Sequence, residues 1–297
     1  MTMNIIVIPT PPDEKNSEYS AHLIEHEKLS LFHENADIFL WNNIRGHIYT
    51  THTEYHFPAD NPTLQKDFIE HLLSPLNKNV TQKEKIRLRE EVKMQGFYQK
   101  AIEHFGKKYF DEKYSYGKSH NISFEKIQKY HAKNYFRKNI LILDKNTKFW
   151  NEKLHIFPKI KTSHEKIGRY QFVSILANPS PENLYIFELL EKFLDIIVAR
   201  NQIHYIPRDI VIGHTQNLLW IIIENDMIPW IQNIGNPDIL AFVSSEKNLS
   251  NNNFLDADIA SICFFQKILS GEQKDKILAS FLEIFYHIFK EILSKKD

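Results

Sequence analysis

The order strand, helix, strands and helices occurs twice along this chain, and it constrains the fold more than any other feature. In the first half, apolar and β-branched runs predict strands at 3–9 and 46–57, with a helix at 16–34 between them. Helical patterns then continue to about residue 137, and 139–143 predict a closing strand. The first half therefore has the elements of a domain of its own.

The second half repeats the types and order of the secondary-structure elements predicted for the first, although the two halves show no repeat of individual residues. Strands are predicted near 170–177, 209–213, 217–224 and 238–244, and helices near 181–198, 253–269 and 272–294. A charged, Lys-rich segment between the halves carries Pro158 and little periodicity. The 297 residues are enough for two domains. We expect domains at 1–147 and 167–297, joined by a linker at 148–166.

Two helix starts in the first half are predicted from local signals. Asn61-Pro62 predicts a helix that begins there and ends near Leu76. Thr81-Gln82-Lys83-Glu84 fits a capping box, in which the first and fourth side chains bond to each other's backbone N–H groups. We therefore expect a long, charged helix to begin at Thr81 and to extend to about residue 110.

Composition excludes several classes of function. Cys263 is the only cysteine, so an internal disulfide is impossible and any metal site must use His and carboxylate ligands. Lys+Arg and Asp+Glu both number 37, which leaves no basic footprint for nucleic acid. Only 8 glycines and no G-x-S-x-G sequence argue against nucleotide and serine-hydrolase chemistry. The chain has no signal-peptide pattern and no apolar segment of the roughly 20 residues that a membrane span needs, so we expect a cytoplasmic protein.

The segment His22-Leu23-Ile24-Glu25-His26 carries the clearest chemical signal. On a helix, His22 and His26 lie on one face one turn apart, so both imidazoles can converge on one ion. Zinc favours such ligands, and a catalytic zinc site keeps one position for water. Glu25 can reach that water without binding the metal itself. The order H-x-x-E-H is the inverzincin pattern, the reverse of the commoner H-E-x-x-H.

A third protein ligand is still required. The predicted long helix offers Glu84, Glu90, Glu91 and Glu103. Glu84 and Glu91 are seven residues apart and share a helix face. Glu90 points about a hundred degrees away from Glu91 and is expected to be solvated. Helix periodicity does not choose between Glu84 and Glu91.

The zinc-type motif and four later segments together resemble the pitrilysin/insulinase family of zinc metallopeptidases, which includes the mitochondrial processing peptidases. The later segments are Thr50 with Thr53 and Tyr55, Glu84-Lys85 with Glu91-Val92, Tyr114-Ser115-Tyr116-Gly117, and the helix and strand from Phe124 to Ile142. His47 stands where the family usually has Asn. The match covers about residues 4–145, and beyond residue 165 it is architectural only.

The resemblance implies an α+β fold of two related domains, each a mainly antiparallel sheet packed with helices, with zinc in the first domain only. It makes Glu91 the ligand that completes a one-zinc site with His22 and His26. Glu25 then acts as the catalytic general base, and Glu84 supports the site.

The chain departs from the family pattern in three respects. It is shorter than the usual two-domain member, and its interval from His26 to Glu91 is also short, so that Glu103 would fit the usual interval better. The family's second domain carries an Arg and a Tyr that contact the substrate backbone, and Arg200 and Tyr205 are the nearest candidates. Their spacing is shorter than the family's, which suggests that a partner supplies this function.

The implied function is a zinc-dependent endopeptidase that cleaves small peptides or leader and precursor segments in an enclosed chamber. Its implied partner is a homologous subunit, as a heterodimer, or a second copy, as a homodimer. Two other functions remain possible. One is a non-catalytic structural or substrate-guiding subunit of a peptidase of the same family. The other is an unrelated α+β binding module with an accidental motif.

Overall fold

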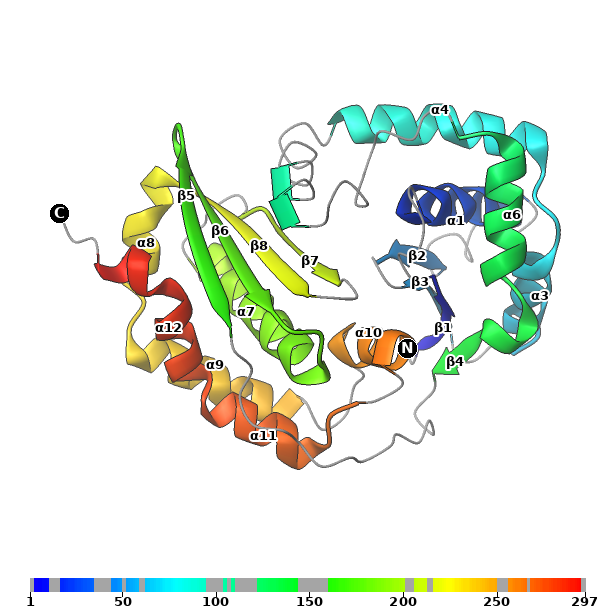
Figure 1. The fold of residues 1–297 in the computed structure, drawn as a ribbon. Coiled ribbons are helices and arrows are strands. Elements are labelled where there is room, and N and C mark those ends of the chain that lie inside the picture. Colours follow the sequence, from blue (N-terminus) through cyan, green and yellow to red (C-terminus); the bar gives the residue numbers. More distant parts are fainter. Residues whose placement is uncertain are drawn as a thin grey trace. The chain divides into compact units, whose positions relative to one another are not determined.

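The chain divides into two compact units, Met1–Lys148 and Phe149–Asp297 (Figure 1). This computed structural model describes residues 3–10, 17–34, 44–49, 52–58, 62–94, 104–105, 108–109, 122–143, 160–200, 206–212, 216–249, 256–265 and 268–294. Each unit contains a four-stranded antiparallel sheet with helices packed on it. The fold is therefore of the α+β class expected from the sequence.

The sheet of unit 1 has the strand order β2-β3-β1-β4. Its strands are β1 (Met3–Pro9), β2 (Arg45–Ile48), β3 (His52–Pro58) and β4 (Leu141–Leu143). Ile6 of β1 pairs with Tyr55 of β3 on one side and with Ile142 of β4 on the other. β2 pairs only with β3 in the described sheet, with Gly46 opposite Tyr55.

Helix α1 forms the centre of unit 1. The unit's helices are α1 (Ser17–Glu34), α3 (Pro62–Leu73), α4 (Lys78–Met94) and α6 (Phe124–Asn134), followed by a 3-10 turn at Arg137–Asn139. α1 contacts β2, α3, α4 and α6, and Leu23 and Ile24 enter a core that includes Tyr55, Phe57 and Phe68. Because so many elements surround α1, several of its polar side chains are buried as well and need partners inside the unit. These side chains are Ser20, Glu25, Glu27 and Lys28.

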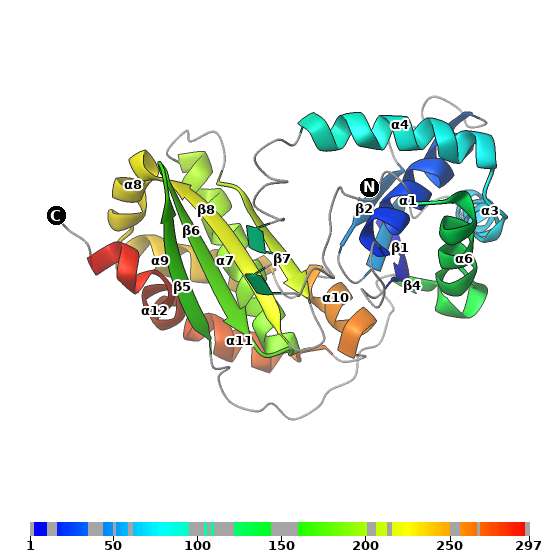
Figure 2. The same ribbon diagram turned by 45° about the horizontal axis from the view of Figure 1, so that its top comes forward.

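The sheet of unit 2 has the order β5-β6-β8-β7, shown with its covering helices in Figure 2. Its strands are β5 (Lys161–Ile167), β6 (Tyr170–Ala177), β7 (Arg208–Ile212) and β8 (Asn217–Glu224). Its helices are α7 (Pro181–Arg200), α8 (Ile228–Gln232) after a 3-10 turn at Asn225–Met227, α9 (Asn236–Leu249), α10 (Asp256–Phe265), α11 (Gly271–Ala279) and α12 (Phe281–Ser294). Phe193 of α7 packs against Phe242, Phe281 and Phe285 at the centre of its core.

The two sheets share the arrangement of three strands. β2-β3-β1 in unit 1 corresponds in order to β7-β8-β6 in unit 2. In both units an inner strand, β1 or β6, leads into the longest helix of the described residues, α1 or α7, which is followed by the other two of these three strands. The fourth strand differs, because β4 comes at the end of unit 1 whereas β5 comes at the start of unit 2.

One predicted strand of the second half is a helix. The prediction at 238–244 is wrong, because these residues lie within α9. Their short apolar run fits either a buried strand or a buried helix. Ile239 and Phe242 are buried while Leu240 is exposed, which is a helical spacing. The Asp238 side chain accepts a hydrogen bond from the backbone N–H of Gly235, as the fourth residue of a capping box does. Asp238, three residues after Gly235, was therefore a sequence signal for the start of a helix.

The predicted capping box at Thr81 is also wrong. α4 begins earlier, and the Asn77 side chain caps it by accepting hydrogen bonds from the N–H groups of Asn79 and Val80, at 3.0 and 3.3 Å. Thr81 lies buried in the first turn of the helix, not at its cap. The expected extension of α4 beyond Met94 falls mainly outside the described residues.

Two further boundaries differ from expectation. Most of the predicted linker at 148–166 lies outside the described residues, but Lys161–Ile167 form strand β5 and pair with β6. The helix predicted at 272–294 is two helices, α11 and α12, which meet at Ser280. No helix in the described ranges is long and apolar enough to cross a membrane.

Glu54 is a buried charge in the sheet of unit 1. Its carboxylate lies 2.7 Å from His52 Nε2 and 3.0 Å from His56 Nε2 on the same strand. Burial alone would raise the pKa of Glu54, but the hydrogen bonds from the two imidazoles outweigh it and hold the pKa at about 2. The pKa of Glu54 is lower in the folded state than in the unfolded chain, so its ionised form stabilises the fold above the unfolded pKa. This stabilisation is lost as the pH falls through the folded pKa.

We expect the metal-free wild type to lose on the order of 2–3 kcal/mol of unfolding free energy from Glu54 alone as the pH falls from about 5 toward 2. Glu54→Gln should flatten this part of the pH profile, measured by urea denaturation in the presence of a chelator. Glu70→Gln is the control, since Glu70 forms an exposed ion pair with Arg137 that contributes little to stability. An unchanged slope in Glu54→Gln would contradict the assignment.

Candidate metal centre

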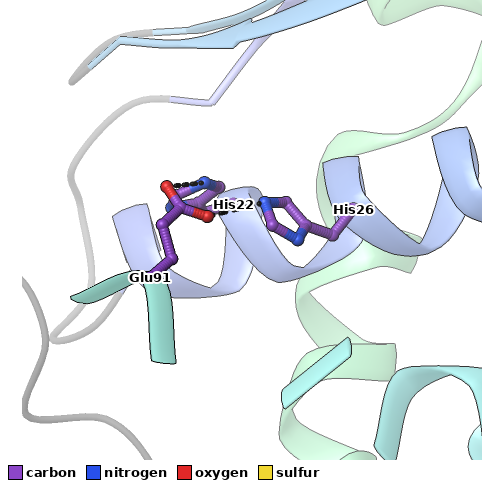
Figure 3. Close-up of side chains that lie close together, drawn as sticks. All are labelled: His22, His26 and Glu91. Carbon is purple, nitrogen blue, oxygen red and sulfur yellow. Dashed lines mark ion pairs between the residues drawn. The ribbon is translucent and has the colours of Figure 1, made fainter. Parts of the chain in front are cut away.

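His22 and His26 of α1 project toward Glu91 of α4 (Figure 3). Glu91 Oε1 lies 3.8 Å from His22 Nε2, and Glu91 Oε2 lies 3.4 Å from His26 Nε2. The two imidazole rings are 4.7 Å apart between centroids. One ligand atom from each of the three residues lies within 4.8 Å of the others, and the part of the chain that the structure describes contains no second such group.

The antiparallel packing of α4 on α1 produces this convergence. On α4, Thr81, Glu84 and Leu88 are buried and Glu91 is partly exposed. Their spacing places all four on one helix face. That face meets α1 so that Glu91 lies beside both imidazoles and Glu84 beside His26 alone.

The donor set fits zinc. In a tetrahedral site with bonds of about 2.0–2.1 Å, ligand atoms lie roughly 3.3–3.5 Å apart. The separations of 3.4 and 3.8 Å from Glu91 to the two imidazoles are close to this spacing. Two nitrogen ligands and one carboxylate also match the donor types of catalytic zinc sites, which reserve a position for water.

The electrostatics of the site also suit a cation. Burial, and then the neighbouring His26, lowers the pKa of His22 to about 3, so its imidazole is neutral and able to bind a metal at ordinary pH. Burial raises the pKa of Glu25 to about 8, and the charges of Glu91 and Glu84 add to the shift. A cation held among these groups would favour the ionised form of Glu25.

Glu84 lies beside Nδ1 of His26, whereas Glu91 lies beside Nε2 of the same ring. Its Oε2 is 3.5 Å from His26 Nδ1, while its Oε1 accepts a 2.7 Å hydrogen bond from Arg87. A carboxylate beside the second nitrogen of a ligand histidine orients the ring and strengthens it as a ligand. The geometry therefore distinguishes Glu84 from Glu91, which sequence periodicity did not.

Gly46 of β2 is a site residue that the sequence interpretation missed. The Glu25 carboxyl occupies the space that a Cβ at position 46 would fill, so any side chain there would displace it. A glycine inside a strand often marks such a close approach, and this was the available signal. Glu25 also lies near the candidate metal ligands, with its Oε2 3.7 Å from His26 Nε2.

The remaining predicted site residues lie in unit 2 or outside the described residues. Arg200, at the end of α7 in unit 2, forms an ion pair with Asp238 of α9 at 2.9 Å. Tyr205 and Glu103 lie outside the described residues, as do Thr50 and the segment 114–117.

Solved structures of proteases share this fold. A protease from Helicobacter pylori aligns with a TM-score of 0.56 and 13% identity, over 98% of this chain and 92% of that one. The first half of the periplasmic protease PqqL from Escherichia coli aligns with a TM-score of 0.50 and 11% identity, over 99% and 88%. An M16-like peptidase from Alicyclobacillus acidocaldarius aligns with a TM-score of 0.50 and 12% identity, over 97% and 89%. No protein-family model matches the sequence, and the search of curated proteins gave no match.

At these identities the alignments establish the fold. The chain has the fold of M16-like peptidases, which confirms at the level of architecture the resemblance stated from the sequence. The three alignments also span most of this chain and of each matched chain, so both units take part in the similarity.

Replacing His22 or Glu91 with Ala should abolish tight zinc binding, because each removes one of three ligands. Glu84→Gln should weaken binding by about 10–100-fold, the usual effect of losing an outer partner of a ligand histidine. Competition with a chromophoric chelator measures both effects, and circular dichroism checks folding. Glu90→Ala is the matched control, since Glu90 is an exposed carboxylate on the same helix. If Glu90→Ala weakened binding as much as Glu91→Ala, the ligand assignment would be wrong.

Proposed function

We propose that this chain is a zinc-dependent endopeptidase that hydrolyses small peptides or leader and precursor segments. The observation that carries the proposal is the convergence of His22, His26 and Glu91, with the Glu25 carboxyl beside them. The shared fold of the H. pylori protease and the M16-like peptidase supports the same class of reaction.

The binding roles follow from the donor atoms. His22 and His26 would hold one Zn²⁺ through their Nε2 atoms, and Glu91 through its carboxylate, since these atoms face one another. Zinc bound there supplies a Lewis acid that polarises the scissile carbonyl and lowers the pKa of water. Glu84 would keep the ring of His26 in its binding orientation.

Glu25 would act as the general base and then as the general acid. As a carboxylate it takes a proton from the attacking water, whose oxygen bonds to the carbonyl carbon. When the C–N bond breaks, Glu25 passes the proton to the leaving amine. Its buried position suits both steps, because the carboxyl has little competing solvent.

An extended substrate suits the position of β2. This strand pairs on one side with β3, and its Gly46 lies against Glu25. A peptide that added to β2 as a further strand would bring its backbone past the general base. Such binding requires an unfolded segment, which favours peptides and precursor segments over folded proteins.

We also propose that the chain acts together with a homologous subunit or a second copy. The PqqL fragment that it resembles is the first half of its protease, and this chain matches 88% of that fragment. Arg200 is already paired with Asp238, which argues against its contacting substrate and is consistent with a contribution from a partner.

The proposal predicts zinc-dependent cleavage that requires Glu25. Zinc-loaded protein should be incubated with a mixture of unstructured peptides in ¹⁸O-labelled water, alone and with a co-encoded homologue where one exists. Mass spectrometry should then find new C-termini carrying one ¹⁸O. Glu25→Gln should retain zinc but lower the cleavage rate by at least about 10²-fold, the usual effect of losing a general base.

Glu90→Gln serves again as the exposed, isosteric control and should cleave at the wild-type rate. Two results would refute the proposal. One is a Glu25→Gln variant as active as the wild type, and the other is zinc-loaded protein that cleaves no peptide under either condition. The second result, with zinc still bound, would favour the non-catalytic subunit.

A further inference from the structure

Buried polar contacts join α1 to the beginning of α4, at the opposite end of the helix pair from Glu91. Glu27, next to the proposed ligand His26, is fully buried. Its Oε1 accepts a hydrogen bond from the Asn77 N–H at 2.8 Å, and its Oε2 accepts one from the Thr81 hydroxyl at 2.5 Å. Thr81 is also fully buried, so this carboxylate is bound on both oxygens inside the unit.

These contacts lie at the N-terminus of α4. Asn77 is the cap of the helix, and the Thr81 hydroxyl lies close to both Glu27 and the Asn77 carbonyl. A negative group is stabilised there by the unpaired N–H groups and by the helix dipole. Burial raises the pKa of Glu27, and the bonds from Thr81 and Asn77 offset only part of that shift. Glu27 therefore binds the N-terminal end of α4.

Lys28 fixes the segment that precedes α4. Its Nζ donates hydrogen bonds to the Ser74 carbonyl at 2.7 Å and to the Ser74 hydroxyl at 3.2 Å. The Lys28 carbonyl in turn accepts a 2.9 Å hydrogen bond from His71 Nε2. Consecutive residues of α1 thus hold consecutive parts of the connection from α3 to α4.

Taken in order, the contacts define the register of the two antiparallel helices. Lys28 meets Ser74, Glu27 meets Thr81, and His26 and His22 meet Glu91. The helix from Thr81 to Glu91 is about 15 Å long at 1.5 Å per residue, and a slip of one residue rotates its side chains by about 100°. Zinc–ligand distances hold to about ±0.2 Å, so the ligand set depends on that register.

We propose that Glu27 and Thr81 are positioning residues of the metal centre: their buried hydrogen bond sets the register of α4 on α1 and so places Glu91 against His22 and His26. This inference rests on the proposed zinc site. Neither residue contacts the metal ligand atoms, and both act through the placement of the helix.

The test compares Thr81→Val, which removes the hydroxyl at nearly constant shape, with Thr81→Ser, which keeps it. Glu27→Gln is a milder second variant in case Thr81→Val folds poorly. Ile69→Val, a core truncation on α3 of the same unit, controls for lost stability. Each protein is measured for zinc affinity by chelator competition, for the visible spectrum of its Co²⁺ form, and for the thermal midpoint of its metal-free form.

We expect Thr81→Val and Glu27→Gln to bind zinc about 10–100-fold more weakly, in the range seen for lost outer contacts, with an altered Co²⁺ spectrum. Thr81→Ser, which keeps the hydroxyl, should retain the wild-type zinc affinity and Co²⁺ spectrum. Ile69→Val should lower the thermal midpoint and leave zinc affinity and the Co²⁺ spectrum at wild-type values.

The inference is overturned if Thr81→Val and Glu27→Gln lower only the thermal midpoint, as Ile69→Val does. That result leaves the proposed function intact, because the wild type still binds zinc and cleaves peptides. If the wild type binds zinc without cleaving peptides, the proposed function fails and the positioning role stands. A wild type that binds no zinc overturns both.

Discussion

The antiparallel packing of α4 on α1 is the interaction on which the rest of the candidate site depends. His22 and His26 come from one helix and Glu91 from the other, so no donor set exists until the two faces meet. The core of unit 1 supplies most of the free energy for that meeting through apolar side chains such as Leu23 of α1 and Leu88 of α4. The polar contacts between the helices then determine the register.

The candidate metal site concentrates charges that a purely structural core would avoid. Glu25 and Glu84 are buried, and Glu91 lies beside the imidazoles of His22 and His26. The free-energy cost of burying these charges together appears as the raised pKa of Glu25, because burial and the neighbouring carboxylates favour its protonated form. A divalent cation bound there would offset this repulsion. Such departures from ordinary core composition occur mainly at functional sites.

Much of the framework was predictable because it rests on local patterns. The strands β1 and β6, the helices α1 and α7, and the pairing of His22 with His26 follow from periodicity and spacing. α9 was missed because a short apolar run fits two structures. Thr81 was misassigned because the same residues that suggest a cap also suit a buried contact, and its partner Glu27 is distant in sequence. The separate roles of Glu84 and Glu91, like the approach of Gly46 to Glu25, depend on how distant elements pack.

The proposed function depends on one zinc ion bound between α1 and α4. Anomalous diffraction at the zinc edge, from crystals of the zinc-loaded protein, would locate that ion. We expect one full anomalous peak within bonding distance of the Nε2 atoms of His22 and His26 and of a Glu91 oxygen, with Glu84 beyond bonding distance. A peak elsewhere in the chain, or a zinc ion that lacks Glu91 as a ligand, would contradict it.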